Sequence, residues 1–310
     1  MRINFAAFRL VLLLGFHFTM GSSSEPISTS QHRDLESRVI GGTIANSARF
    51  PYYTFIKSYS QYGDGGPCGG SLIAPDMVLT AAHCLGSDGF GTSSILGIDV
   101  FVNSTTYKYS EYEYYREATK WVVHPDFDYS RRVNDIALIF LDAPVKGVPL
   151  VVINRNASIP VSKNPSALRV IGLGVNSINY SNFDSTETLP DQLMQAELNP
   201  LAVTACKKTF GSYYIGEKVL CAGGEGLTSP CSGDSGGPLL MMKSSAQKDV
   251  QVGIVSWGKG CDPDYPGVFT RVSSCGRWID VQICKYSKSK PSTCPTLKPT
   301  KKPSTKPVAG

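Results

Sequence analysis

The chain has 310 residues, of which 42% are hydrophobic and 18% charged, a composition typical of a globular protein with a sizeable core. The net charge of +5 arises at the end of the chain, because residues 285–310 contain seven lysines and no acidic residue. Subtracting those seven from the 30 basic residues leaves 23 against 25 acidic residues. The body of the protein therefore lacks the basic surface that nucleic-acid binding requires, and we expect no nucleic-acid partner.

The first residues have the pattern of a secretory signal peptide. Arg2 precedes an apolar run from Phe8 to Phe18, and small residues follow from Gly21 to Ser24. The run is too short to span a bilayer. We therefore predict a signal peptide over residues 1–23, a secreted, extracellular protein and no membrane span, with a buried helix or a membrane anchor as the alternative. Residues 24–38 are Ser-rich without periodicity, which indicates an exposed pro-segment.

From residue 39 onward, short apolar runs alternate with Gly, Pro, Asn and Asp. The runs are rich in β-branched and aromatic residues, which favours strands. One late segment has helical spacing instead, with Trp278, Ile279 and Ile283 on one face before Cys284. The sequence therefore predicts an all-β fold with a C-terminal helix. The apolar runs that carry this prediction are residues 52–56, 77–80, 136–141, 169–172 and 251–256.

The last segment, residues 285–310, repeats Lys, Pro, Ser and Thr with almost no apolar side chain. Such a segment cannot bury enough surface to fold, so we predict a disordered tail. Its lysines suit adhesion to an acidic surface or polysaccharide, and its hydroxyl residues suit O-glycosylation. A solvated linker without a specific role is the alternative.

Nine cysteines behind a signal peptide indicate an oxidising compartment, in which thiols pair as disulfides. The odd number leaves at least one cysteine unpaired within the chain. Three Asn-x-Ser/Thr sequences, beginning at Asn103, Asn156 and Asn179, are candidate glycosylation sites. Acidic residues within 111–117 do not have the spacing of a calcium loop. We predict no metal and no cofactor.

Three segments supply the residue types of nucleophilic catalysis by serine. His83 lies in LTAAHC, Asp135 in NDIALI and Ser235 in CSGDSGGP. A serine hydroxyl is a poor nucleophile unless an imidazole takes its proton and a carboxylate orients that imidazole. The glycines around Ser235 would let backbone amides surround a developing oxyanion. Each residue alone has an ordinary structural interpretation, but the three motifs in this chain order do not.

Together with VSWG at residues 255–258, these motifs make the chain resemble the chymotrypsin/trypsin family of serine proteases, from Val39 to about Cys284. The resemblance implies two packed six-stranded antiparallel β-barrels with a C-terminal helix and an active site in the cleft between the barrels. It also implies a protease domain over residues 39–284 and serine endopeptidase activity through an acyl-enzyme intermediate.

The same resemblance implies a role for each residue of the motifs. Ser235 would be the nucleophile, His83 the general base and then acid, and Asp135 the partner that fixes the histidine tautomer. The backbone amides of Gly233 and Ser235 would form the oxyanion hole. Ser256 would support Asp135 and lead into the strand that pairs with the substrate backbone.

The segment RVIGG resembles the activation site of the family, with cleavage between Arg38 and Val39. The new ammonium of Val39 would pair with Asp234 in a low-dielectric pocket and order the amide of Gly233 and the specificity pocket. The chain would then be a zymogen that an activating protease cuts. An ordinary linker residue at Arg38 is the alternative.

The resemblance also implies disulfides. One bridge of the family is absent as a pair, because Leu168 and Met241 occupy its positions, where an apolar contact could replace it. If Cys275 and Cys284 share the final helix, they lie about 13 Å apart, too far to bridge. We prefer a Cys284–Cys294 pair, which leaves Cys275 to pair between chains. The pairs implied by the resemblance are Cys68–Cys84, Cys206–Cys221 and Cys231–Cys261.

Substrate preference depends on the residue six positions before the nucleophile, where an acidic side chain in this family attracts Lys or Arg. Here that residue is Ser229, followed by Pro230. Gly258 and Gly267 match wall positions at which a missing side chain leaves the pocket open, with Trp257 beside them. The resemblance therefore implies a chymotrypsin-like preference for large apolar residues. A preference for Arg or Lys stays open, because the neighbouring loop carries two acidic residues, Asp262 and Asp264.

Two functions of other classes remain open. A protease scaffold without activity could act as a binding or inhibitory protein. His83, Asp135, Ser235 and the activation sequence are all present, however, and such proteins usually lack one of them. The second alternative is a surface-binding protein whose functional element is the tail. For the enzyme, the expected partners are protein or peptide substrates and an activating protease.

Overall fold

The structure is a computed structural model that describes residues 39–46, 48–60, 63–85, 95–106, 114–160, 167–175, 177–181 and 184–294. The chain divides into two units, Met1–Asp34 and Leu35–Gly310, and all described residues belong to the second unit. The predicted signal peptide, the pro-segment with Arg38 and the part of the tail after Cys294 lie outside the described residues. Among the helices that the structure describes, none is long and apolar enough to cross a membrane.

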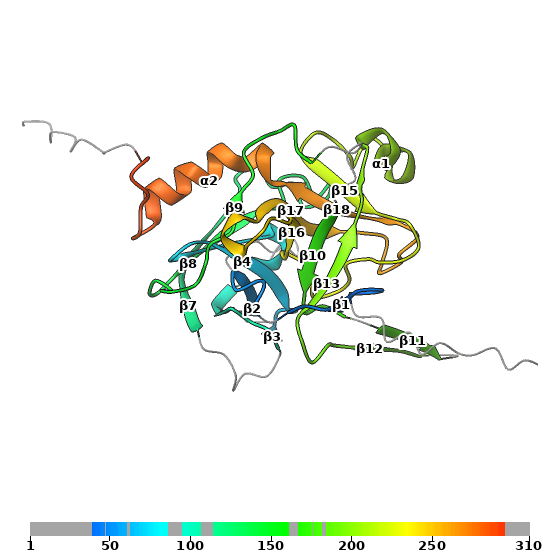
Figure 1. Cartoon of the computed structure of the whole chain (residues 1–310), viewed down its shortest axis with the longest axis horizontal. Coiled ribbons are helices and arrows are strands. Elements are labelled where there is room, and N and C mark those ends of the chain that lie inside the picture. The colour runs from blue at the N-terminus through cyan, green and yellow to red at the C-terminus, as the bar shows by residue number, and fades with distance from the viewer. Residues whose placement is uncertain are drawn as a thin grey trace, which may run out of the picture. The chain divides into compact units, whose positions relative to one another are not determined.

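The first sheet of the domain closes into a barrel of six strands. Its strands β2, β4, β7 and β8 are labelled in Figure 1. Its order is β2-β4-β5-β8-β7-β6, and β2 pairs with both β4 and β6, which closes the ring. All residues of β5 and β8 are buried, as their apolar runs predict. The strands of this sheet are β2 (Tyr53–Ser60), β3 (Gly63–Asp64), which extends the edge of β2, β4 (Cys68–Ala74), β5 (Met77–Thr80), β6 (Ile95–Val102), β7 (Tyr114–Val123) and β8 (Ala137–Leu141).

The second sheet has nine strands, with β13-β10-β16-β17-β18-β15 at its centre, β1 and β14 at its ends and β9 parallel to β17. Its described strand pairs include none between β13 and β15, so it is a half-barrel, which is consistent with the two-barrel fold that we predicted. Its strands are β1 (Thr43–Ile44), β9 (Val152–Ile153), β10 (Leu168–Gly172), β13 (Met194–Leu198), β14 (Pro200–Leu201), β15 (Val219–Gly223), β16 (Pro238–Met241), β17 (Val250–Trp257) and β18 (Pro266–Arg271). A separate hairpin joins β11 (Ser177–Ser181) and β12 (Asp184–Thr188).

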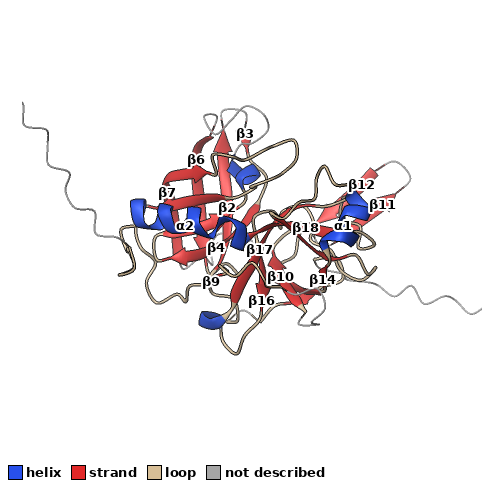
Figure 2. Cartoon of the chain, turned by 90° about the horizontal axis from the view of Figure 1, so that it is seen from above, coloured by secondary structure: helices blue, strands red, loops and turns tan. Residues whose placement is uncertain are grey.

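The two sheets pack against each other. One cluster of buried side chains contains residues of both, such as Leu79 of β5 and Ile254 of β17. The strands dominate the fold, and few helices accompany them (Figure 2). The all-β prediction with two packed sheets and a C-terminal helix is therefore confirmed. The helices are the 3-10 helices Ala82–Leu85 and Ala246–Lys248 and the α-helices α1 (Val203–Phe210) and α2 (Val272–Tyr286).

Helix α2 lies beside β9 and β17, as its apolar face requires. Ile279 and Ile283 are buried on that face, and Trp278 is partly buried with its ring 5.0 Å from the ring of His124. The helix continues two residues beyond Cys284, to Tyr286.

The segment after α2 belongs to the folded domain as far as Cys294, which differs from the prediction that a disordered tail begins at residue 285. The hydroxyl of Ser287 donates to Asp76 Oδ1 at 2.6 Å, and the amide of Lys288 donates to Asp76 Oδ2 at 2.5 Å. A disulfide between Cys284 and Cys294 closes the loop. The lysine-rich composition could not predict this anchoring, because the acceptor is the buried carboxylate of Asp76, which lies between β4 and β5.

Four disulfides are present, and they include the three pairs that the family resemblance implies. Cys275 is the free cysteine, and it is only 2% exposed. The suggestion that it pairs between chains is therefore wrong, because its thiol lies on the inner face of α2. Leu168 and Met241 are register partners on β10 and β16, so an apolar pair stands where the absent bridge would be. The bridges of the domain are Cys68–Cys84, Cys206–Cys221, Cys231–Cys261 and Cys284–Cys294.

Candidate active site

Asp135 and His83 form a buried, directed pair. Asp135 Oδ2 lies 2.7 Å from His83 Nδ1, and Asp135 Oδ1 accepts the backbone amide of His83 at 2.9 Å. The carboxylate is fully buried, whereas the imidazole is 15% exposed. Ser256 Oγ donates to Asp135 Oδ2 at 2.5 Å, and Thr270 Oγ1 donates to the carbonyl oxygen of Asp135 at 2.8 Å. These bonds from three elements fix the orientation of both side chains.

The electrostatics of this pair favour one tautomer of the histidine. Burial raises the pKa of Asp135, but the charge and hydrogen bonds of His83 and the hydroxyl of Ser256 outweigh that effect and lower the pKa below its ordinary value. An ionised carboxylate at Nδ1 favours the proton on that nitrogen. Within the described residues, His83 Nε2 has no hydrogen-bond partner. It is therefore free to accept a proton from another group.

Ser235 lies on a tight loop that contacts the first sheet near His83. The backbone amide of Gly69 on β4 donates to the carbonyl oxygen of Ser235 at 2.7 Å. The next residue, Gly236, has φ +79°, and a Cβ there would lie 2.2 Å from Thr80 Oγ1. Because Thr80 ends β5 shortly before His83, the loop brings a partly exposed Ser235 to the histidine side of the barrel.

Two amides of this loop are free to bind a ligand. The amides of Asp234, Gly236 and Gly237 all donate to carbonyl oxygens of the chain. Those of Gly233 and Ser235 have no acceptor in the part of the chain that the structure describes. Gly233 has φ +94°, a conformation that glycine adopts without strain. The two free donors flank Asp234 and can act on one oxyanion.

Asp234 is a buried carboxylate without a cation. Its Oδ1 accepts the amide of Gly174 at 2.8 Å and its Oδ2 accepts the amide of Cys231 at 2.9 Å. Burial raises its pKa to about 6 even though these two amides lower it. No basic group pairs with it among the described residues. A Cβ at Gly172 would lie 1.9 Å from Asp234 Oδ1, so residue 172, at the end of β10, must be glycine.

Val39 and Ile40 are the first described residues, and they contact the second sheet and the loop that precedes Asp234. Val39 is fully buried in an apolar cluster of the second sheet. It has φ +36°, which is uncommon for a β-branched residue. Ile40 forms an isolated bridge with Ser229, whose amide donates to the carbonyl oxygen of Ile40 at 3.0 Å.

The predicted specificity pocket is uncharged at its floor. Ser229 is buried, and its hydroxyl donates to the carbonyl oxygen of Pro230 at 3.1 Å. A Cβ at Gly267 would lie 3.0 Å from the ring of Pro230 and 3.1 Å from the ring of Phe269, so this wall has no room for a side chain. A Cβ at Gly258 would meet only a carbonyl oxygen at 3.5 Å. The two acidic residues of the neighbouring loop, Asp262 and Asp264, are exposed.

The family model described as Trypsin matches residues 39–279. The chain belongs to the trypsin family. It is therefore a serine endopeptidase that hydrolyses peptide bonds in protein substrates, as we predicted. The alternative of a protease scaffold without activity gains no support from this match.

Three curated relatives give the same picture. The chain is 33% identical to a vitellin-degrading protease of Bombyx mori, over 79% of this chain and 86% of that protein. It is 30% identical to a trypsin of Phaedon cochleariae, over 84% of this chain and 93% of that protein. It is 29% identical to serine proteinase stubble of Drosophila melanogaster, over 79% of this chain but only 31% of that much longer protein.

Two aromatic side chains pack against the indole of Trp257 in this trypsin-family domain. The ring of Phe210, at the end of α1, lies 4.9 Å from the indole, and the ring of Tyr214 lies 5.9 Å from it. Trp257 was expected beside the pocket, whereas Phe210 and Tyr214 were not predicted from the sequence. No motif could have revealed them, because they come from a helix and loop far from Trp257 in the sequence.

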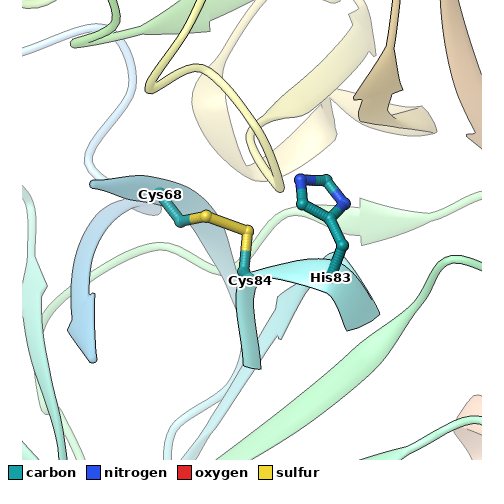
Figure 3. A group of neighbouring side chains, drawn as sticks. All are labelled: Cys68, His83 and Cys84. Atoms are coloured by element: carbon teal, nitrogen blue, oxygen red, sulfur yellow. A yellow bond between two sulfur atoms is a disulfide. The ribbon is translucent and has the colours of Figure 1, made fainter. Parts of the chain in front are cut away.

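A histidine and two cysteines of the trypsin-family domain lie close enough to suggest a metal site. The ligand atoms of Cys68, His83 and Cys84 lie within 4.8 Å of one another. Figure 3 shows, however, that the two sulfur atoms form a disulfide, with the imidazole to one side. A disulfide offers no thiolate, and Nδ1 of His83 is already bonded to Asp135. This donor set does not fit a metal ion.

The candidate glycosylation sites differ in exposure. Asn156 is exposed, and its Oδ1 accepts the amide of Ser158 at 2.9 Å. Asn103 is partly buried in a turn with φ +58°, and its backbone amide donates to the carbonyl oxygen of Tyr53 at 2.9 Å. The side chain of Asn179 lies outside the described residues.

Proposed function

We propose that His83, Asp135 and Ser235 perform the hydrolysis in two acyl-transfer steps. The observation that carries this proposal is the buried Asp135–His83 pair, which leaves only Nε2 of the histidine to exchange a proton. Ser235 Oγ would attack the carbonyl carbon of the scissile bond while its proton passes to His83 Nε2. The C–N bond then breaks as that proton passes to the leaving amine, which forms the acyl-enzyme. Water repeats the sequence and releases the acid.

The charge that develops on the carbonyl oxygen would be stabilised by the amides of Gly233 and Ser235. Both amides lack a protein acceptor within the described chain, which supports this role. Losing one such donor typically costs about 100- to 1,000-fold in rate. Ser256 and Asp135 act through the histidine, because they fix its orientation and tautomer.

We propose that the protein is made as a zymogen and activated by a cut between Arg38 and Val39. Asp234 supports this, because its carboxylate is fully buried without a cation. The ammonium released at Val39 would supply the missing charge, and the ion pair would be strong in so buried a place. It would also hold the neighbouring amide of Gly233 in position. The activating protease must itself prefer arginine.

For the activated enzyme we propose a preference for Phe, Tyr or Leu before the scissile bond. The buried, uncharged floor at Ser229 and the apolar rings of Pro230 and Phe269 support it. A guanidinium in such a pocket loses hydration that nothing restores, whereas an aromatic ring gains by leaving water. One relative is named a trypsin, which keeps a preference for Arg or Lys as the second candidate. The exposure of Asp262 and Asp264 disfavours it.

We further propose that the protein is secreted and glycosylated at Asn156, and that its lysine-rich tail binds an acidic surface or polysaccharide. Four disulfides support an oxidising compartment. Folding of the segment up to Cys294 confines the proposed tail to residues 295–310.

The decisive experiment replaces the nucleophile. After cleavage at Arg38 by an added protease, Ser235→Ala should show no measurable hydrolysis and no labelling by a serine-directed phosphonate, whereas the exposed control Ser244→Ala should retain both. Full activity in Ser235→Ala would refute the mechanism. For activation, N-terminal sequencing of the purified proenzyme incubated alone should detect no Val-Ile-Gly-Gly. Its rapid appearance in wild type but not in Ser235→Ala would show self-activation and contradict the proposed pocket.

A further inference from the structure

A cavity of about 980 Å³ lies against the C-terminal half of α2, and its lining includes none of the residues assigned to catalysis. One wall is the end of β4 with Ile73 and Ala74. Val281 and Ile283 of α2 also line the cavity, and the segment that the Cys284–Cys294 disulfide holds in place completes the lining. The volume is at the upper end of the range of about 300–1,000 Å³ typical of small-molecule sites. The cavity therefore has room for an elongated small molecule.

The cavity lining is largely apolar. Ile73 and Ile283 are almost fully buried in the domain, and Leu150 is partly buried. Val281, by contrast, is 52% exposed. An apolar chain in the cavity would remove this surface from water.

The charged residues of the lining are not balanced. Asp280 is bound by Arg155, whose Nε donates to both of its carboxylate oxygens at 3.0 and 3.2 Å. Arg277 and Lys285 also line the cavity, and neither pairs with an acidic group in the described part of the chain, although the ammonium of Lys285 lies 4.8 Å from the centre of the Tyr286 ring. Two cations without a carboxylate partner in the described residues thus lie beside an apolar cavity.

We propose that this cavity binds an amphiphile with a single anionic head group and an unbranched apolar chain, such as a fatty acid. The chain would lie against Ile73, Val281 and Ile283, and the head group would pair with Arg277 and Lys285. The chain's own segment 295–310 does not fit this site by charge, because it contains four lysines and no acidic residue. The like charges of Arg277 and Lys285 would repel it.

Dodecanoate is a suitable probe, with dodecanol and dodecyltrimethylammonium as matched head-group controls. Calorimetric titration of the full chain, below the micelle concentration of each probe, should show saturable binding of one dodecanoate. We expect dodecanoate to bind at least tenfold more tightly than either control. Decanoate, two methylenes shorter, should bind more weakly by about fourfold per methylene, the fold-change that corresponds to about 0.8 kcal/mol. Absence of saturable binding, or equal affinity for all three head groups, would overturn the proposal.

Two variants at exposed positions locate the site without disturbing the core. Val281→Glu places a carboxylate beside the chain and should weaken dodecanoate binding at least tenfold. Arg277→Gln should reduce the preference for dodecanoate over dodecanol, and the matched control Lys207→Gln on α1 should change neither. Unchanged binding in Val281→Glu would place the probe elsewhere and refute the assignment. Displacement of dodecanoate by a synthetic peptide of residues 295–310 would show that the tail is the occupant, which also contradicts it. Peptide hydrolysis is no part of these readouts.

Discussion

The backbone amide of Ser229 donates a hydrogen bond of 3.0 Å to the carbonyl oxygen of Ile40. Ile40 directly follows Val39, which the proposed activation cut would turn into the first residue of the enzyme. The floor of the proposed specificity pocket is thus bonded to the new N-terminal segment through the main chain. Any rearrangement of Val39 on activation reaches the pocket without an intervening side chain.

The first prediction concerns that floor. Wild-type enzyme should cut after Phe, Tyr or Leu with a higher kcat/KM than after Arg or Lys, because Ser229 offers no charge to a buried cation. Ser229→Asp should shift the ratio toward Arg by at least tenfold, or about 1.4 kcal/mol. The measurement is kcat/KM on peptides that differ only at the residue before the cut.

Asp262→Asn is the matched control for this test, since it removes a nearby but exposed carboxylate. It should leave the preference unchanged. A wild-type preference for Arg of tenfold or more would contradict the uncharged-floor proposal. If Asp262→Asn then abolished that preference, Asp262 would be the missing charge.

The second prediction concerns Ser256, which donates to the carboxylate of Asp135 at 2.5 Å. Ser256→Ala leaves a buried charge with one donor fewer, at a cost of about 1.5–3 kcal/mol for such a bond. We expect kcat to fall about 10- to 100-fold with little change in KM, because Ser256 acts through His83. The acidic limb of the pH–rate profile should move in the same variant. Ser274→Ala, at an exposed serine of α2, is the control and should match wild type.

The third prediction concerns Asp234, whose pKa burial raises to about 6 in the uncleaved protein. Between the ordinary carboxyl pKa of 3.8 and pH 6, the folded state holds a proton that the unfolded state has lost. The free energy of unfolding therefore falls as pH rises through this interval, by about 3 kcal/mol from this group. Urea denaturation of the uncleaved Ser235→Ala protein at pH 4 and pH 7 measures the difference.

Adding Asp234→Asn to that protein should remove this part of the pH dependence, because the amide does not titrate. Cleavage at Arg38 should remove it as well, because the ammonium of Val39 would stabilise the ionised carboxylate. An identical pH dependence with and without Asp234 would show that the carboxylate is solvated or already paired.

The fourth prediction concerns Asp76, which holds the segment after α2. Asp76→Ala deprives Ser287 and the amide of Lys288 of their buried acceptor. We expect the free energy of unfolding to fall by about 2–4 kcal/mol. Limited proteolysis after Lys288 should accelerate in the variant. Asp142→Ala, at an exposed position near Lys288, is the control; equal proteolysis of both variants would mean that the disulfide alone holds the segment.

The sequence was informative where a strand is buried on both faces or where a short motif carries the whole signal. The run 77–80 coincides with β5, and the run 169–172 lies within β10. These strands are buried along almost their whole length, apart from the half-buried Arg169 in β10, and are therefore mostly apolar. In contrast, polar residues such as Arg116 and the exposed Glu117 interrupt the first part of β7, and the sequence did not predict this strand.

Long-range contacts were beyond reach for a different reason. The pairing of His83 with Asp135 could be inferred only through family motifs, whereas the aromatic rings that cover Trp257 belong to no motif. The prediction that the disordered tail begins at residue 285 failed for the same reason. Composition describes what a segment can bury by itself, and residues 287–294 are held by Asp76, more than two hundred residues earlier in the chain.

Cys275 gives the protein an intrinsic reporter of its own local opening. It is the one cysteine of nine outside a disulfide, it is 2% exposed, and burial raises the pKa of its thiol. A thiol reagent in water can therefore react with it only in molecules whose α2 has moved away from the sheets. The rate of that reaction, relative to the rate with an unfolded chain, measures how often the last helix detaches while the four disulfides remain intact.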